Sequence, residues 1–539
     1  MAELSTEELR RRLRADRDLR TLVETRAAAH PDRVFLRFAG GDLSYAELDE
    51  LADRAAAALL ASGVRRGDAV AIMMRNCPEW IALWFGAVKI GAVVVPVNVA
   101  FRGDGLAHIL GNSRAALTAV DADLLPQLDP VRAELAEPGQ LVVREVPGVP
   151  AGDRPSLAEF LDHPARRPPG PPPATGDPAA ILYTSGTTGP AKGCLLPHGQ
   201  YVAAAHQMAV NLEYGPSDTL YSCLPLFHIN AQNYSVLCAW AAGATLALDA
   251  GFTASGFWRR LIDTGATAFN IIGGIPLMLW AQPPSSLERA HRARVAFGVP
   301  VPLELWPRWE QRFGVRVVYA YGMTENGLPT LFPYERTPAA PELRGSGGRA
   351  SASAEVSVVG PDDEPLGPGE VGEIVTRPKI SNTMMLEYFE NPAATVAAMR
   401  NCWFHTGDLG YLDHDGYLFY VDRKKDAMRR RGEMVSSWDV EAAVRKHPAV
   451  SDCAAYGLPS ELGEDEIMVA VVPADRASFD PAALLEFCRE RLAAFQLPRY
   501  LRVMDALPRT QTERVEKYKL RADGITADTW DASAVSSSR

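Results

Sequence analysis

Short apolar runs alternate with longer helical patterns through the first hundred residues. Strand-like runs cover residues 34–38, 68–74 and 92–97, and helical patterns cover residues 44–62 and 79–90. Ser44 precedes Glu47 by three positions, which is a capping box at the start of the first of these helices. Strands separated by helices are typical of a parallel sheet covered on both faces. The pattern therefore predicts an α/β fold.

The same alternation continues to about residue 320. Further helices are expected at 198–212, near 232–242 and at 255–264, and further strands at 179–184, 267–272, 295–298 and 315–319. A charged helix is expected over residues 5–30, before Pro31. Length supports more than one domain, because 539 residues exceed what one ordinary core accommodates.

The second part of the chain has a different pattern. Valine and glycine turn signals over 345–377 predict a small β-rich part, and residues 424–524 have the pattern of a compact unit with both helices and strands. We therefore expect a large N-terminal α/β domain at 1–422 that includes the β-rich part. A small α+β C-terminal domain follows at 423–526. The small polar residues 527–539 are expected to be disordered.

Composition excludes several classes of protein. The net charge is −11 and the sequence pI is about 5.5, which argues against nucleic acid or an anionic membrane as the main partner. The seven cysteines form no Cys-x-x-Cys pair, and the N-terminus has no signal-peptide pattern. No apolar stretch reaches the roughly 18 residues of a membrane span. A cytoplasmic protein with reduced thiols is expected.

The segment Tyr183–Gly193 (YTSGTTGPAKG) carries the strongest chemical signal. It holds three glycines and a lysine among hydroxyl side chains, directly after an apolar run. Glycines let backbone N–H groups turn toward a ligand, and such a nest of donors suits phosphate oxygens. Lys192 adds a point charge. The segment is not a Walker A loop, because Lys192 is followed by Gly193 instead of Ser or Thr. These residues predict a phosphate-binding loop.

Four motifs in this order resemble those of the adenylate-forming superfamily, which includes acyl- and aryl-CoA synthetases, peptide-synthetase adenylation domains and luciferases. They are Tyr183–Gly193, Tyr321–Glu325, Thr406–Asp408 and Asp422–Asp426. Phrases such as LPLFHINAQ and RGEMVSS are similar to the carnitine/crotonobetaine-CoA ligase-like branch. The resemblance covers nearly the whole chain. It implies that a carboxylate attacks the α-phosphorus of ATP to form an acyl-adenylate and pyrophosphate, and that an acceptor, often CoA, then displaces AMP.

The resemblance also implies a nucleotide site. The residues expected to bind the β- and γ-phosphates are Thr184, Ser185, Gly186, Thr187, Thr188, Gly189 and Lys192. Thr324 is expected at the α-phosphate and Glu325 at Mg²⁺, since a carboxylate suits a hard cation shared with phosphates. Asp408 and Arg423 are expected at the ribose, and Tyr321 with Gly322 near the adenine.

An acid pocket and a hinge are implied in the same way. The residues expected to line the pocket are His228, Gly273, Gly274, Phe297 and Gly298. The C-terminal domain is expected to rotate about Lys425 between the two half-reactions. Gly432 and Glu433 are then expected to face the main domain during transfer to the acceptor.

Two positions depart from the family pattern. The C-terminal motif of the family has Gly-Lys where this chain has Glu513-Arg514, and Arg514 is expected to replace the catalytic lysine. A guanidinium is planar and always charged, so the exchange is not conservative. Pro300 stands where many relatives have glycine, and it removes an N–H beside the acid pocket.

Three activities remain open at this point. The favoured one is an acid–CoA ligase that uses ATP, Mg²⁺ and CoA. The second is an adenylate-former with another acceptor, such as an ATP-dependent diazotase that activates nitrite for transfer to an aryl amine. The third is a nucleotide-binding protein without catalysis, which the presence of Lys192, Glu325, Asp408 and Arg423 disfavours. A homodimer is possible in each case.

Overall fold

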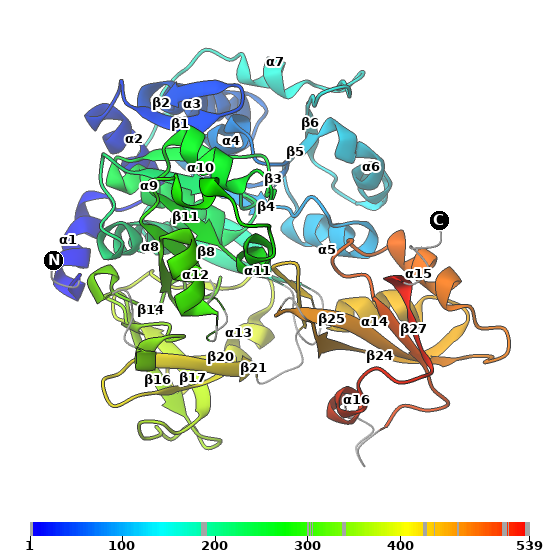
Figure 1. Ribbon diagram of the computed structural model, residues 1–539. Coiled ribbons are helices and arrows are strands. Elements are labelled where there is room, and N and C mark those ends of the chain that lie inside the picture. The colour runs from blue at the N-terminus through cyan, green and yellow to red at the C-terminus, as the bar shows by residue number, and fades with distance from the viewer. Residues whose placement is uncertain are drawn as a thin grey trace.

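The computed structural model describes most of the chain. The described residues are 4–184, 191–298, 301, 303, 305–336, 341–423, 428–435, 437–460, 463–508, 515 and 517–533, without the side chains of Arg336, Asp422, Arg423, Met434, Trp438 and Tyr518. Figure 1 shows the N-terminal part as two sheets with their helices, the β-rich part below it, and the C-terminal elements to one side.

The first large sheet is parallel except at one edge. Its strand order is β13-β12-β11-β9-β10-β1-β2, and β2 alone runs antiparallel to its neighbour among these strands. The bounds are β1 Val34–Phe38, β2 Gly41–Ser44, β9 Thr219–Ser222, β10 Thr245–Leu248, β11 Ala268–Ile271, β12 Val295–Gly298 and β13 Arg316–Tyr319. The parallel α/β arrangement predicted from the alternation is thus present.

The second large sheet carries the predicted phosphate loop. Its order is β18-β8-β7-β4-β3-β5-β6, with β8 antiparallel to both β7 and β18. The bounds are β3 Ala69–Met73, β4 Val93–Pro96, β5 Leu117–Asp121, β6 Gln140–Arg144, β7 Pro178–Thr184, β8 Lys192–Pro197 and β18 Glu387–Tyr388. The β7–β8 hairpin places both ends of the glycine-rich segment side by side.

Helices from both sheets meet in one aromatic core. Trp240 lies 4.5 Å from Phe35, 4.6 Å from Tyr45 and 5.2 Å from Phe85, measured between ring centroids. The helices of this part are α1 Thr6–Ala15, α2 Leu19–Ala29, α3 Tyr45–Ala61, α4 Pro78–Ile90, α5 Gly103–Ser113, α6 Leu125–Glu134, α7 Leu157–Leu161, α8 His198–Asn211, α9 Cys238–Ala242, α10 Phe257–Thr264, α11 Ile275–Trp280 and α12 Trp306–Phe313. The predicted capping box of α3 is present, with reciprocal Ser44 and Glu47 bonds. The single helix expected over 5–30 is wrong: α1 ends before Asp16, and Asp18 caps α2.

The β-rich part forms an antiparallel sheet. Its order is β16-β17-β20-β19, with β21 also paired to β20. The bounds are β14 Thr330–Leu331, β15 Arg349–Ala350, β16 Ala354–Val359, β17 Gly372–Pro378, α13 Pro392–Ala398, β19 Met399–Arg400, β20 Trp403–Leu412 and β21 Leu418–Arg423.

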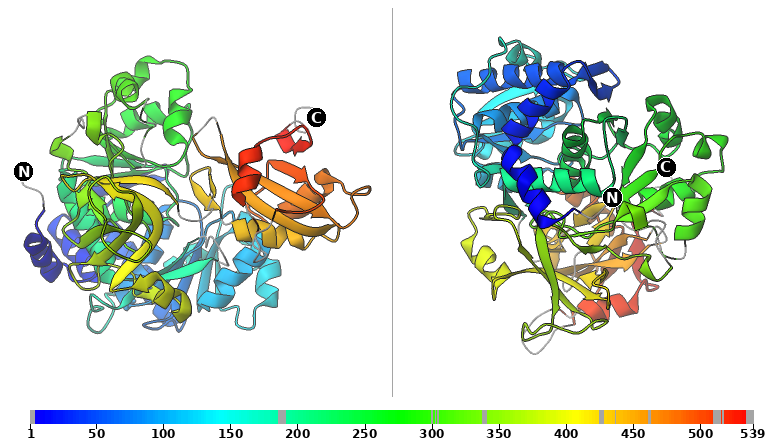
Figure 2. Two further views of the ribbon diagram at one scale, coloured as in Figure 1. Left: turned by 90° about the horizontal axis from the view of Figure 1, so that it is seen from below. Right: turned by 90° about the vertical axis from the view of Figure 1, so that its left-hand side faces the viewer.

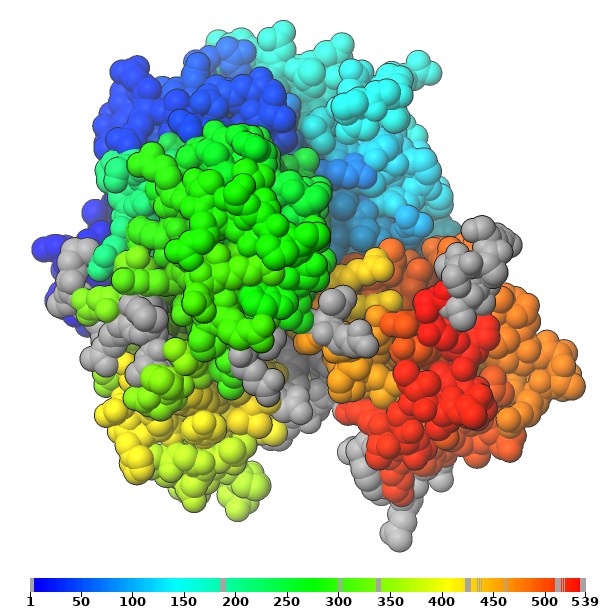
Figure 3. All heavy atoms as spheres, viewed as in Figure 1, coloured from blue at the N-terminus to red at the C-terminus, as the bar shows by residue number. Residues whose placement is uncertain are grey.

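The C-terminal elements have their own sheet and core. The hairpin β22–β23 precedes a sheet of order β24-β25-β26-β27. The bounds are β22 Met428–Arg430, β23 Glu433–Val435, α14 Ser437–Arg445, β24 Val450–Pro459, β25 Asp465–Pro473, α15 Pro481–Arg489, β26 Tyr500–Val503, α16 Lys517–Asp523 and β27 Thr529–Asp531. Figure 2 shows this group as a separate body, and Figure 3 shows that its surface meets the surface of the N-terminal part.

The disorder expected over 527–539 is wrong for the described residues of that segment. Thr529–Asp531 form β27, which pairs antiparallel with β26. Arg499 holds the strand through its guanidinium, which lies 3.3 Å from the Asp531 carboxylate, and Trp530 packs against the core. Sheet pairing and this ion pair therefore order residues 529–531, although their polar composition did not predict a strand. Among the described helices, none combines the length and hydropathy that a membrane span requires.

Candidate active site

The phosphate-loop segment is closed by strand pairing. Thr184 pairs with Lys192 and Tyr183 pairs with Gly193 across the β7–β8 hairpin. A Cβ on Gly193 would lie 2.7 Å from Ile181, so only glycine fits beside that side chain. Ser185, Gly186, Thr187, Thr188 and Gly189 lie outside the described residues.

Helix α5 holds both sides of this hairpin. The Tyr183 hydroxyl donates a hydrogen bond to Asn112 Oδ1 at 2.6 Å, and His108 Nε2 lies 2.8 Å from the Ala191 carbonyl oxygen. The His108 and Tyr183 rings also meet edge to face. These contacts fix where the loop leaves and re-enters the sheet, and sequence reasoning did not single out α5.

Lys192 and Glu325 come together on one tyrosine. The Lys192 ammonium lies 4.7 Å from the centroid of the Tyr388 ring, and the Tyr388 hydroxyl donates to Glu325 Oε1 at 3.0 Å. Glu325 is buried. The neighbouring Thr324 carbonyl accepts a hydrogen bond from Gln200 Nε2 at 2.8 Å. Tyr388 on strand β18 thus holds the Lys192 ammonium and the Glu325 carboxylate next to the β7–β8 hairpin. No sequence motif predicted that β18 takes part in the site.

The turn Tyr321–Glu325 is tight, and its single glycine is required. A Cβ on Gly322 would lie 2.3 Å from the Gly327 carbonyl oxygen. Backbone bonds between Met323 and Gly327 close the turn. The Tyr321 hydroxyl donates to Asp408 Oδ2 at 2.7 Å, so the predicted adenine and ribose residues are in contact. Tyr321 therefore orients the Asp408 carboxylate.

Asp408 and Arg423 are neighbours across the β20–β21 pair. Their Cα atoms are register partners. Asp408 lies in a buried position, and its backbone N–H donates to Thr406 Oγ1 at 3.1 Å. The Arg423 side chain, the predicted hinge Lys425, and Pro300, Glu513 and Arg514 lie outside the described residues. Lys517 is engaged within the C-terminal elements, where its ammonium lies 2.8 Å from Ser437 Oγ and 2.7 Å from Glu441 Oε1.

The predicted acid-pocket residues lie at the ends of neighbouring strands. Gly273 and Gly274 follow β11, while Phe297 and Gly298 end β12. A Cβ on Gly298 would come within 1.7 Å of the Ile271 carbonyl oxygen, so this glycine serves the close approach of two strands. Phe297 is buried and lies 5.7 Å from Tyr234, centroid to centroid.

A π-helix follows His228. The segment η2 Asn230–Leu237 is wound as a π-helix and continues directly into α9. The sequence predicted an ordinary helix there, because apolar periodicity does not distinguish the wider winding. π-Helical turns are rare and frequently occur at functional sites.

The C-terminal hairpin contacts this group of predicted pocket residues. His228 Nε2 lies 2.7 Å from Glu433 Oε1 on β23. Burial acts to lower the pKa of His228, but the Glu433 carboxylate and its hydrogen bond outweigh it and raise that pKa. A Cβ on Gly273 would lie 2.4 Å from Glu464 Oε1 and 2.5 Å from the Gly432 Cα. The structure therefore brings His228 and Gly273 against the turn that carries Gly432 and Glu433.

Comparisons with known proteins agree with this arrangement. A model of the AMP-binding enzyme family matches residues 23–389, and a model of the AMP-binding enzyme C-terminal domain matches residues 439–514. The crotonobetaine/carnitine–CoA ligase of Shigella dysenteriae is 33% identical over 486 residues, which is 89% of this chain and 93% of that ligase.

Two solved structures share the fold over almost their full length. A Bacillus subtilis o-succinylbenzoate CoA synthetase has a TM-score of 0.81 and 25% identity, covering 95% of this chain and 99% of that one. A Mycobacterium tuberculosis fatty acyl CoA synthetase has a TM-score of 0.69 and 30% identity, covering 94% of this chain and 98% of that one.

Proposed function

The chain belongs to the AMP-binding enzyme family, and we propose that this ATP-dependent, AMP-forming ligase activates a small carboxylic acid and transfers it to CoA. The observation that supports the chemistry most directly is the contact series from Lys192 through Tyr388 to Glu325 beside the β7–β8 hairpin. Attack at the α-phosphorus needs positioning and neutralisation of charge more than covalent help. A held cation and a held carboxylate supply both.

The proposed nucleotide roles are those that the family resemblance implies, and the same contacts support them. We propose that the loop from Thr184 to Lys192 binds the β- and γ-phosphates and that Thr324 contacts the α-phosphate. Glu325 fits a Mg²⁺ ion shared with phosphate oxygens, because it is a buried carboxylate already oriented by a phenol. Bound Mg²⁺ would neutralise charge on the phosphates.

The remaining roles concern the ribose and the second half-reaction. Asp408, oriented by Tyr321, is proposed to accept hydrogen bonds from the ribose hydroxyls beside Arg423. We also propose that the domains divide between residues 422 and 423 and that the C-terminal domain rotates about Lys425. Arg514 is proposed to replace the family lysine. The His228–Glu433 contact would then belong to the state in which the acid is transferred.

Pyrophosphate release tests the function. The protein is incubated with MgATP and a panel of alkyl and aryl acids, with and without CoA, and pyrophosphate and thioester are measured separately. Release that depends on an acid, together with a CoA thioester of that acid, is the expected result. Pyrophosphate release without a thioester from any acid would contradict CoA as the acceptor, and no release with any acid would contradict the ligase activity.

The Glu513-Arg514 replacement is compatible with one second candidate. A ligase whose family lysine is replaced could activate nitrite, a much smaller acid, and transfer it to an aryl amine. Adding nitrite with an aminoaryl acid to the same assay tests this activity. Nitrite-dependent pyrophosphate release with loss of the aryl amine, and without a CoA requirement, would support it over the CoA ligase.

A further inference from the structure

Two asparagines meet on one side of the acid pocket. Asn270 on β11 donates from Nδ2 to Asn230 Oδ1 at 3.1 Å and to Ser235 Oγ at 2.9 Å. Asn230 and Ser235 both belong to the π-helix η2. Asn230 follows His228 by two residues, and Asn270 precedes Gly273 by three, so the pair adjoins the residues already placed at the pocket.

The pair leaves one donor and one acceptor unused. Among the described residues, none accepts a hydrogen bond from Asn230 Nδ2, and none donates one to Asn270 Oδ1. Asn230 is half-buried and Asn270 is 4% exposed. Neither atom is among the fully buried polar atoms that lack a partner, so both keep surface that a ligand can reach.

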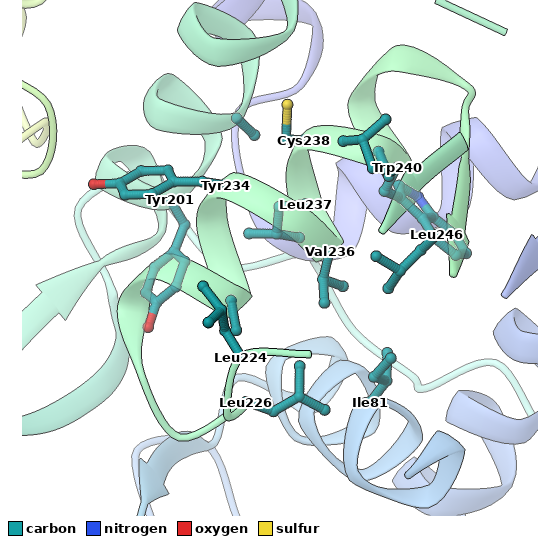
Figure 4. Close-up of a cluster of buried hydrophobic side chains, with 14 of the residues drawn as sticks. Ile81, Tyr201, Leu224, Leu226, Tyr234, Val236, Leu237, Cys238, Trp240 and Leu246 are labelled. Carbon is teal, nitrogen blue, oxygen red and sulfur yellow. The ribbon is translucent and has the colours of Figure 1, made fainter. Parts of the chain in front are cut away.

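Aromatic rings form the neighbouring wall. Asn270 and Phe297 are register partners on parallel strands, so their side chains share one face of the sheet. The Tyr234 ring meets the Phe297 ring at 80°, edge to face. In Figure 4 Tyr234 belongs to the buried hydrophobic cluster and lies at the other end of it from Trp240 and Leu246. Two aromatic rings at a steep angle to each other therefore lie beside the amides.

We propose that the Asn230–Asn270 pair binds a neutral hydroxyl or amino substituent on the ring of an aromatic acid. This rests on the proposed ligase function and names the substrate class of that site. The Phe297 and Tyr234 rings would contact the ring of the acid. A hydroxyl or amino group can accept from Asn230 Nδ2 and donate to Asn270 Oδ1.

Other acids fit these groups less well. An alkyl chain would bury both amide groups without partners, which is the arrangement that hydrogen-bonding sites reject most strongly. A quaternary ammonium group carries no N–H donor and no acceptor, so it cannot use either amide. Asn230, Ser235, Asn270, Tyr234 and Phe297 carry no charge at neutral pH, which favours a neutral substituent.

The ranking of acids by the natural protein is the first test. The value of kcat/KM for acid-dependent pyrophosphate release is measured for benzoic acid, its 3- and 4-hydroxy and 3- and 4-amino derivatives, hexanoic acid and a trimethylammonium acid. At least one hydroxy or amino derivative is expected to exceed benzoic acid by roughly 10- to 100-fold. A ranking led by benzoic acid, hexanoic acid or the trimethylammonium acid overturns the subsite. Absence of release with every acid overturns the ligase function instead.

Variants then assign the preference to the asparagines. Asn270→Leu keeps a similar shape and removes the amide, so the ratio between the substituted acid and benzoic acid should fall toward one while the KM for ATP is unchanged. Asn230→Ala should lower the same ratio. Because Asn230 is the half-buried residue of the pair, this variant replaces Asn270→Leu in the test if Asn270→Leu does not fold. Asn211→Leu is the control, since its amide donates to the Phe332 carbonyl at 2.9 Å away from the pocket. An unchanged ratio in both pocket variants overturns the proposal.

Discussion

The two ends of the site are built in different ways. At the nucleotide end, each group sits on a short continuous segment, such as the β7–β8 hairpin or the turn Tyr321–Glu325. At the acid end, every important contact joins elements far apart in sequence, as in His228 with Glu433 or Gly273 with Gly432. The described contacts of the first end therefore lie within the N-terminal part, whereas those of the second depend on how the C-terminal elements dock.

This difference predicts that substitutions at the two ends affect different half-reactions. Changes at the nucleotide end should slow pyrophosphate release and everything after it. Changes at the docking contacts should spare pyrophosphate release and slow transfer to the acceptor. The following variants test that separation.

Glu325→Gln should have the largest effect. It removes the proposed Mg²⁺ ligand while keeping the side-chain shape, and pyrophosphate release should fall by roughly 100- to 1000-fold. Tyr388→Phe is the control, because it removes the hydroxyl that donates to Glu325 Oε1 and keeps the ring beneath the Lys192 ammonium. It should cost less than about 10-fold. Turnover at the natural rate in Glu325→Gln would show that this carboxylate holds no catalytic metal.

Sequence singled out the segments of the proposed nucleotide end, for a physical reason. Phosphate binding needs donors and glycines at fixed spacing along one segment, and this leaves a pattern that can be recognised in YTSGTTGPAKG and YGMTE. The sequence did not mark Tyr388 or His108, although both contact these segments. A single tyrosine or histidine brought in by tertiary packing carries no local pattern.

The acid end and the C-terminus were less predictable. His228, Gly273 and Phe297 were expected at the pocket, but the Asn230–Asn270 pair depends on a π-helix that apolar periodicity cannot distinguish from an α-helix. The ordering of Thr529–Asp531 depends on strand pairing with β26, which polar composition conceals. The parallel α/β sheets, by contrast, followed directly from alternating apolar runs.

Gly273→Ala should have the next largest effect, restricted to the transfer step. The new Cβ would lie 2.4 Å from Glu464 Oε1 and 2.5 Å from the Gly432 Cα, so the C-terminal hairpin must move away. Thioester formation from preformed adenylate should fall roughly 10- to 100-fold, since each 1.4 kcal/mol of lost docking is tenfold. Pyrophosphate release in the first turnover should change less than about threefold.

Gly265→Ala is a matched control for that variant. Gly265 has φ +67° and Gly273 has φ +54°, so both substitutions impose similar backbone strain of about 1 kcal/mol. A Cβ at position 265 meets no atom of the described residues within 4 Å. If Gly265→Ala slowed transfer equally, strain and not docking would be the cause.

Glu433→Gln should have a smaller effect that depends on pH. The Glu433 carboxylate raises the pKa of His228 against the effect of burial, so the charged contact is fully present below the ordinary histidine pKa of about 6.5. It is lost as pH rises through the raised value, which weakens docking in alkaline solution. The variant should lower the pKa of His228 and slow transfer a few-fold at neutral pH.

Histidine titration by NMR measures that pKa directly. The His228 resonance is identified by its absence from His228→Asn, and its titration is compared in the natural protein and in Glu433→Gln. An unchanged His228 pKa would mean that the two side chains are apart in solution.

Asp104→Asn should have the smallest effect, although it also lies at the docking surface. Asp104 on α5 forms an ion pair with Lys446, but the two side chains are 70% and 49% exposed. Exposed pairs are screened by salt and contribute little, so thioester formation should change less than about threefold and the change should vanish at high ionic strength. A loss as large as that of Gly273→Ala would mean that surface charge fixes the docked position. The expected contrast instead assigns that role to packing at Gly273, where the backbone of Gly432 lies almost as close as the Glu464 side chain and cannot rotate away.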